Sequence, residues 1–127
     1  MSAEDLAKKI VHLIDDDFAV RDSTELLLQI AGIDVRAYAS GIEFLNDADP
    51  SEIRCLVIDV HMPGINGIEL LDRLRTAGII TPAIFITAIG GTAALMAAAA
   101  RTGATILLKP FKSGELIKGI NELLSNQ

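Results

Sequence analysis

The sequence lacks tryptophan and is poor in other aromatic residues, with one tyrosine and four phenylalanines among 127 residues. It therefore offers no aromatic platform on which nucleic-acid bases stack. A net charge of −6 also argues against a surface that follows a phosphate backbone. We expect no nucleic-acid binding through this domain.

Cysteine and long hydrophobic runs are equally scarce. The single cysteine, Cys55, cannot form an internal disulfide, and its apolar neighbours predict a buried free thiol. The opening residues, MSAEDLAKK, contain no apolar signal region, and every apolar stretch is well short of a membrane span of about 20 residues. These absences predict a cytoplasmic protein without a membrane contact.

What the chain does contain is typical of a globular protein. Half of its residues are hydrophobic and 22% are charged. A length of 127 residues is enough for one hydrophobic core and too short for two. No linker, repeat or low-complexity segment interrupts it, so we expect one domain over residues 1–127.

Apolar strand patterns alternate with amphipathic helix patterns five times along the chain. The predicted strands are Ile10–Ile14, Ile33–Tyr38, Cys55–Ile58, Pro82–Ile86 and Ala104–Leu108. The predicted helices are Phe18–Ala31, with Leu26, Leu27 and Ile30 at helical spacing, Gly41–Asn46, Asn66–Ala77, Thr92–Arg101 and Gly114–Leu124; Asp47–Glu52 is a predicted loop. This alternation predicts an α/β fold, a doubly wound parallel sheet with helices on both faces.

Polar residues follow four of the five predicted strands. They are Asp15, Asp16 and Asp17 after the first strand, Asp59 after the third, Thr87 after the fourth and Lys109 after the fifth. Parallel strands end at the same edge of a sheet, which is where open α/β sheets bind their ligands. The topology therefore predicts that these side chains lie close together.

Such a set of groups suits phosphoryl chemistry. Neighbouring carboxylates repel one another, so they take up protons or hold a cation, and their oxygens are ligands that Mg²⁺ prefers. A carboxylate can also attack phosphorus and form an acyl phosphate. A lysine and a hydroxyl nearby would stabilise the oxygens of the transferred group. The residue types thus predict a phosphoryl-accepting site that uses Mg²⁺.

Taken one at a time, these residues have simpler explanations. Asp17 is expected to be a solvated loop residue. A lone threonine at a strand end is usually satisfied by the backbone, and a lone lysine usually lies at the surface. His12 lies inside a predicted strand, and His61 has no second His or Cys at ligand spacing, so we expect neither histidine side chain to bind metal.

Four motifs resemble the receiver domains of response regulators in two-component signalling, the chemotaxis receivers among them. They are IDD at residues 14–16, VIDVHMPGINGIELL at 57–71, FITA at 85–88 and LLKPF at 107–111. The similarity covers nearly the whole chain, with the motifs in the family's order and spacing. It implies a flavodoxin-like sheet of five parallel strands in the order 2-1-3-4-5, with five helices.

The resemblance also implies a role for each residue at the sheet edge. Asp59 would be the phosphoacceptor, and Mg²⁺ would be held by Asp16 directly, by Asp15 through water, by Asp59 and by the backbone carbonyl of His61. Thr87 would donate a hydrogen bond to the phosphoryl group, and Lys109 would form an ion pair with it. The Lys109–Pro110 peptide bond is expected to be cis, as in the family.

The fifth predicted strand departs from the family pattern, and Gly103-Ala104 stands one residue closer to Lys109 than in the family's usual spacing. The family commonly has an aromatic residue three positions before the lysine, where this chain has Ile106. We expect Thr87 to remain a switch residue while the aromatic part of the switch is absent or altered. In the family, the positions at which His61 and Ile89 stand control water access to the acyl phosphate, and the bulky Ile89 here predicts slow hydrolysis.

The resemblance implies partners in place of a substrate that is turned over. A sensor histidine kinase or a histidine phosphotransfer protein would donate the phosphoryl group, with Phe18, Val20 and Pro110 among its contacts. A downstream protein would bind the face formed by Thr92–Arg101, Ala104–Leu108 and Gly114–Leu124. The sequence leaves open whether a second copy of the chain binds there as a homodimer.

Two other functions compete with this interpretation. A haloacid-dehalogenase-like phosphatase would use Asp15, Asp17, Thr87 and Lys109, but it needs an acidic pair after the lysine and leaves Asp59 without a role. The second alternative is a pseudo-receiver, an interaction module that phosphorylation does not control. Ile106 in place of the aromatic residue keeps this alternative open.

Overall fold

A sheet of five parallel strands forms the centre of the protein in the computed structural model, which describes residues 10–125. The strands are β1 (Ile10–Ile14), β2 (Asp34–Tyr38), β3 (Cys55–Asp59), β4 (Ala83–Thr87) and β5 (Thr105–Leu108). Their order across the sheet is β2-β1-β3-β4-β5, which confirms the predicted flavodoxin-like arrangement. The opening residues 1–9, which the sequence showed to be polar, lie outside the described part.

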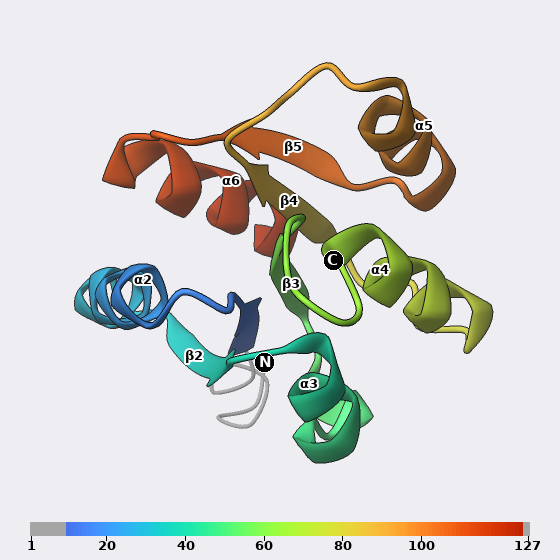
Figure 1. The fold of residues 1–127 in the computed structure, drawn as a ribbon. Helices are drawn as coiled ribbons and strands as arrows, with labels where there is room; N and C mark the ends of the chain where they lie inside the picture. The colour runs from blue at the N-terminus through green and yellow to red at the C-terminus, as the bar shows by residue number, and fades with distance from the viewer. Residues whose placement is uncertain (1–9, 126–127) are drawn as a thin grey trace.

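Helices cover both faces of the sheet. Figure 1 shows α2 and α6 on one side and α3, α4 and α5 on the other. Their bounds are Phe18–Ile30 for α2, Gly41–Asp47 for α3, Gly67–Thr76 for α4, Ala93–Thr102 for α5 and Ser113–Ser125 for α6. The predicted loop before β3 contains a short 3₁₀ turn, Pro50–Glu52. Among residues 10–125, no helix has the length and apolar character needed to cross a bilayer.

Four of these helices begin at polar caps that the sequence supplies. Asp17, Ser40, Asn66 and Thr92 each accept a hydrogen bond from a backbone N–H in the first turn of the helix that follows. Such caps satisfy N–H groups that have no partner within the helix. They fix the point at which the chain leaves each strand end and enters the next helix.

The hydrophobic core consists of two clusters, one on each face of the sheet. The larger lies under α3, α4 and α5, and the other lies under α2 and α6. Every residue of β1, β3 and β4 is buried, because helices cover these central strands on both sides. Cys55 is fully buried, as predicted, and burial raises the pKa of its thiol to about 12.

The apolar residues that indicated α2 are not those that the helix buries. Leu26 and Ile30 are 56% and 77% exposed, whereas Leu28 is fully buried and Thr24 nearly so. Thr24 and Leu28 are four positions apart, so they lie on the same side of the helix, toward the sheet. The helix itself was predicted correctly, but its outer face carries two large apolar side chains.

His12 is a structural residue, as we expected. Its ring is fully buried on β1, with Nδ1 3.1 Å from the hydroxyl of Tyr38 and Nε2 3.4 Å from the carbonyl oxygen of Glu52. Because that carbonyl only accepts, Nε2 carries the proton and Nδ1 accepts from Tyr38. Burial lowers the pKa of the imidazole, which keeps it neutral.

Candidate functional site

The strand ends bring the residues singled out in the sequence to one edge of the sheet. Asp15 follows β1 directly, Asp59 and Thr87 are the last residues of β3 and β4, and Lys109 follows β5. All four strands run parallel and are neighbours in the sheet, so these ends lie side by side. We call the group Asp15, Asp16, Asp59 and Lys109 the acidic corner.

The groups of the acidic corner are close enough to act together. Single carboxylate oxygens of Asp15, Asp16 and Asp59 all lie within 4.8 Å of one another. The Nζ atom of Lys109 is 3.8 Å from Asp15 Oδ2 and 3.8 Å from Asp59 Oδ2. One ammonium group thus lies between two buried carboxylates and offsets part of their mutual repulsion.

Asp15 is fixed from several directions, unlike the neighbouring Asp16. Its backbone N–H donates to the carbonyl oxygen of Tyr38 (3.1 Å), and its Oδ1 accepts from the backbone N–H of Asp17 (2.9 Å). Its own carbonyl oxygen accepts from Arg21 Nη1 (2.8 Å). The Asp15 side chain is therefore held in one place, while Asp16 is exposed.

The surroundings of Asp59 change the acidity of its carboxyl group. Burial raises the pKa of its carboxyl to about 6, and the charge of Asp15 adds to this increase. Lys109 and a hydrogen bond from the backbone N–H of His61 (3.3 Å) act in the opposite direction. A cation that binds close to such a carboxyl group stabilises its charged form.

The donor set of the acidic corner fits a hard divalent cation. Three carboxylates at the ends of two neighbouring strands supply oxygen ligands and no nitrogen or sulfur, which is the chemistry that Mg²⁺ prefers. Asp15 and Asp59 are buried and Asp16 is exposed, so the cluster opens to solvent on one side. A Mg²⁺ ion there would keep several of its waters.

The remaining predicted site residues lie at or near the same edge. The hydroxyl of Thr87 is bonded to the backbone of Ile89, at 3.0 Å to the carbonyl oxygen and 3.1 Å to the amide nitrogen. The side chain of His61 is exposed. The Lys109–Pro110 bond is cis, as the resemblance implied. Ile106 is half-buried on β5 and packs against the cluster under α3, α4 and α5.

Asp17 does not belong to the acidic corner. We expected it to be a solvated loop residue, and it is exposed, but its Oδ1 caps α2 by accepting from the N–H of Val20 at 3.1 Å. The cluster of carboxylates contains Asp16 in its place. The Asp15 and Asp17 pair that a dehalogenase-like phosphatase would use is therefore not assembled.

A surface groove of about 550 Å³ starts beside Lys109 and runs along α2. It is lined by Val20, Ser23, Thr24, Leu27, Ala88, Lys109, Pro110, Phe111 and Ser113. Two of the three predicted partner contacts, Val20 and Pro110, thus lie in this groove. Phe18 is not among its lining residues; it is 70% exposed, with the guanidinium of Arg21 5.4 Å from its ring centroid.

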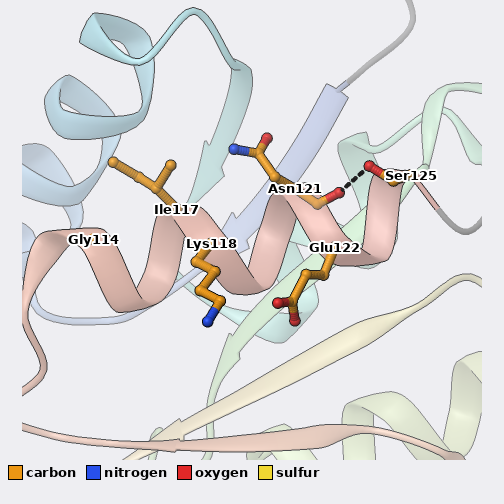
Figure 2. Close-up of a pocket in the computed structure, with 6 residues that line it drawn as sticks. All are labelled: Gly114, Ile117, Lys118, Asn121, Glu122 and Ser125. Atoms are coloured by element: carbon orange, nitrogen blue, oxygen red, sulfur yellow. Dashed lines mark hydrogen bonds between the residues drawn. The ribbon is translucent and has the colours of Figure 1, made fainter.

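A second hollow, of about 530 Å³, follows α6 and contains none of the predicted site residues. Figure 2 shows Ile117 and Asn121 on one side of the helix and Lys118 and Glu122 on the other. The Ser125 hydroxyl donates to the carbonyl oxygen of Asn121 at 2.7 Å. All of its lining residues come from one helix, so it gathers no groups from different strand ends.

Reasoning from sequence missed two parts of the site. Arg21, which donates to the carbonyl of Asp15, drew no attention, although an arginine on the second turn of a helix that follows an acidic loop is a detectable signal. The Thr87 hydroxyl is bonded to the backbone of Ile89, and the sequence holds no signal of this contact, because backbone groups are the same at every position.

Comparison with known proteins agrees with this geometry. The response regulator receiver domain family matches residues 11–121. The transcriptional regulatory protein FixJ of Azorhizobium caulinodans is 38% identical over 114 residues, which are 90% of this chain and 54% of FixJ. The chain spans about half the length of the curated relatives that it matches.

Two solved structures have the same fold. A response regulator receiver protein from Burkholderia phymatum is 40% identical with a TM-score of 0.76, covering 91% of this chain and 94% of that one. The Vibrio cholerae chemotaxis protein CheY4 is 29% identical with a TM-score of 0.81, covering 91% and 98%. Fold, motifs and relatives agree, and the chain belongs to the receiver domain family of two-component response regulators.

Proposed function

We propose that this chain accepts a phosphoryl group on Asp59 and uses the resulting acyl phosphate as a signal. The observation that supports this most strongly is the convergence of Asp15, Asp16, Asp59 and Lys109 on one corner of the sheet. An oxygen of the Asp59 carboxylate would attack phosphorus, and the bond from phosphorus to the donor's leaving group would break with its electron pair.

The other members of the acidic corner would assist this transfer. Asp16 would bind Mg²⁺ directly, Asp15 through water, and Asp59 and the backbone carbonyl of His61 would complete the protein's share of the ligands. Bound Mg²⁺ would neutralise charge on the phosphoryl oxygens. Lys109, already 3.8 Å from Asp59 Oδ2, would pair with one of these oxygens, and Thr87 would donate to another.

Intact-mass measurement of the protein after incubation with Mg²⁺ and a small-molecule phosphodonor tests the proposal. We expect one added phosphoryl group on the unaltered chain and none on Asp59→Asn. Asp34→Asn is the matched control, because Asp34 is an exposed aspartate at the start of β2, at the opposite edge of the sheet. An adduct that persists in Asp59→Asn would contradict the assignment.

The two alternative functions predict different results in the same experiment. A phosphatase would turn over an aryl phosphate, and we expect no turnover, because Asp17 caps α2 instead of joining the carboxylate cluster. A pseudo-receiver would form no adduct while still binding Mg²⁺. Absence of an adduct on the unaltered chain, with Mg²⁺ binding measured separately, would therefore favour the pseudo-receiver.

We propose the groove beside Lys109 and the outer face of α2 as the docking surface for the phosphodonor protein, a histidine kinase or a histidine phosphotransfer protein. The groove ends next to the acidic corner, so a histidine presented there would come close to Asp59. Leu26 and Ile30 extend the apolar surface along α2. Exposed apolar patches of this kind are typical of protein interfaces.

Substitutions on α2 test this docking surface. In combination, Leu26→Ser and Ile30→Ser are expected to slow phosphoryl transfer from a phosphorylated histidine phosphotransfer protein about tenfold. A tenfold loss corresponds to about 1.4 kcal/mol of interface energy. Labelling by a small-molecule donor should stay unchanged. Ile80→Ser is the matched control, because Ile80 is 82% exposed and precedes β4 at the other edge of the sheet. Equal slowing by all three changes would count against the assignment.

The output surface that we propose is the face formed by α5, β5 and α6. Ile89, Met96 and Leu108 are each more than half exposed on or beside these elements. A downstream protein or a second copy of the chain would cover them. Because the relatives are about twice as long, the activity that this face controls in a longer protein is part of the same proposal.

A further inference from the structure

An exposed phenylalanine follows the acidic corner closely along the chain, at the first position of α2. Phe18 is 70% exposed, and the guanidinium of Arg21 lies over its ring, 5.4 Å from the ring centroid. The two residues are three positions apart on the helix, so their side chains are neighbours on its surface. A guanidinium at this distance is attracted by the face of an aromatic ring. The ring of Phe18 therefore holds a side chain that also reaches the acidic corner.

Arg21 uses the same guanidinium to hold the backbone between two carboxylates of the acidic corner. Its Nη1 atom donates to the carbonyl oxygen of Asp15 at 2.8 Å. Because a peptide unit is planar, a bond to this carbonyl also restrains the N–H and Cα of Asp16. The next peptide unit is restrained as well, since the N–H of Asp17 donates to Asp15 Oδ1 at 2.9 Å. Asp16 is thus placed by the two peptide planes on either side of it.

Asp16 depends on this backbone restraint more than Asp15 does. Asp15 is buried, and its own N–H also donates to the carbonyl oxygen of Tyr38 at 3.1 Å. Asp16 is exposed, yet it supplies one of the three carboxylate oxygens of the acidic corner. A metal ligand that is already in place binds the ion more tightly, because no free energy is spent on ordering it. The position of the Arg21 guanidinium therefore affects the affinity for a cation.

An unrestrained arginine side chain has many rotamers, and ordering it costs conformational entropy. The contact with Phe18 favours the rotamers from which Nη1 reaches the carbonyl of Asp15. We propose that Phe18 is a positioning residue for the Mg²⁺ site: its ring holds Arg21, and Arg21 holds the peptide unit that joins Asp15 to Asp16. This role rests on the proposed function, because it requires the acidic corner to bind Mg²⁺.

Calorimetric titration with Mg²⁺ tests this role through a double-mutant cycle. Phe18→Leu keeps an apolar side chain and removes the ring. We expect it to weaken Mg²⁺ binding about threefold, which corresponds to about 0.7 kcal/mol and is the size of an exposed cation–π contact. Arg21→Gln should weaken binding about tenfold, and the double variant also about tenfold, because the ring then has no guanidinium to hold. A loss of about thirtyfold in the double variant would show that Phe18 acts independently of Arg21 and would overturn the proposal.

Two further variants separate the aromatic face from the loss of exposed apolar surface. Phe18→Tyr keeps the aromatic face and should bind Mg²⁺ within about 1.5-fold of the parent. Ile80→Ala is the matched control, because it shortens an apolar side chain that is 82% exposed and lies before the start of β4, away from the strand ends. It should bind Mg²⁺ as the parent does. A loss in either variant equal to that in Phe18→Leu would overturn the proposal.

Nuclear magnetic resonance without Mg²⁺ tests the positioning step itself. The amide of Asp16 shares its peptide unit with the carbonyl of Asp15, so its chemical shift reports the hydrogen bond from Arg21. Phe18→Leu should move this shift part of the way toward its value in Arg21→Gln and should make the Arg21 Nε–H group more mobile. An unchanged Asp16 shift in Phe18→Leu would overturn the positioning role.

The failure of this role and the failure of the proposed function give different results. Mg²⁺ binding that is the same in the parent and in Phe18→Leu would overturn the role of Phe18 and leave the proposed function standing. No Mg²⁺ binding by the parent would overturn the proposed metal site and the role of Phe18 together.

Discussion

The acidic corner and the loop of residues 88–91 lie at the same edge of the sheet, but the protein holds them differently. Asp15 is fixed through its backbone N–H, its carbonyl and its carboxylate, by groups from β2, the following loop and α2. The loop is held at its start by the hydroxyl of Thr87. Its residues are exposed, whereas Asp15 and Asp59 are buried.

This difference suits two different tasks. A site that binds a cation and orients a reacting carboxylate works best when its groups are already in place, because no energy is then spent on ordering them. A segment that reports the chemical event must have two conformations of similar free energy. The loop, held at its start by one hydroxyl, is restrained less than Asp15 is.

The largest expected effect is on the free energy of unfolding, because the charged carboxylate of Asp59 is partly buried in the acidic corner. The pKa of Asp59 is about 6 in the folded protein, above the value of about 3.9 in an unfolded chain, so the folded state holds the proton more tightly. The resulting stabilisation is fully present below about pH 4 and is lost as the pH rises through 6. Asp59→Asn cannot lose a proton and should escape this loss.

Urea unfolding without Mg²⁺ measures the effect. Asp59→Asn should match the parent near pH 4 and exceed its free energy of unfolding by roughly 2 kcal/mol at pH 7.5. Addition of Mg²⁺ at pH 7.5 should stabilise the parent and reduce the difference. If the difference between the two proteins were the same at both pH values, burial of the Asp59 charge would not be its cause.

A smaller effect is expected from the arginine that holds Asp15. Arg21→Gln removes the donor to the Asp15 carbonyl, and partners that orient metal ligands typically contribute about tenfold to affinity. Calorimetric titration with Mg²⁺ should show this loss. Arg36→Gln is the matched control, since it removes the same charge from an exposed position on β2. Equal losses in both variants would point to net charge and not to the position of Asp15.

The smallest effect is expected in the loop. Gly91 has a φ of +78°, so Gly91→Ala should lower the free energy of unfolding by about 1 kcal/mol. A Cβ on the neighbouring Gly90 would contact the Cδ2 atom of Leu108, which is half exposed and can turn away. Gly90→Ala should therefore cost less than about 0.5 kcal/mol. The reverse order in urea unfolding would show that packing, and not backbone conformation, restrains this loop.

The strand ends illustrate why so much of the site could be predicted from the sequence. Short apolar runs that end on Asp15, Asp59, Thr87 or Lys109 mark both a buried strand and the point where it leaves the core. Parallel topology then requires these ends to meet. The resemblance to receiver domains rests on the same residues, and it implied the strand order that the structure has.

Helix α2 illustrates where this kind of reasoning stops. Three consecutive leucines, Leu26 to Leu28, allow more than one side of the helix to face the sheet. Local periodicity predicts a helix in each case, but only packing against β1 and β2 selects Leu28 and leaves Leu26 exposed. The apolar outer face of α2, and with it the proposed docking surface, followed from that selection.

The sequence by itself determined the alternation of strands and helices, the caps that begin the helices and the chemical groups at each strand end, because these depend on neighbours along the chain. The tertiary structure decided how those groups are held. It assigned Arg21 to the carbonyl of Asp15, placed Lys109 between two carboxylates and paired the Thr87 hydroxyl with the backbone of Ile89. Distances between side chains, burial and pKa depend on atoms from several elements at once, and such contacts exist only after the chain has folded.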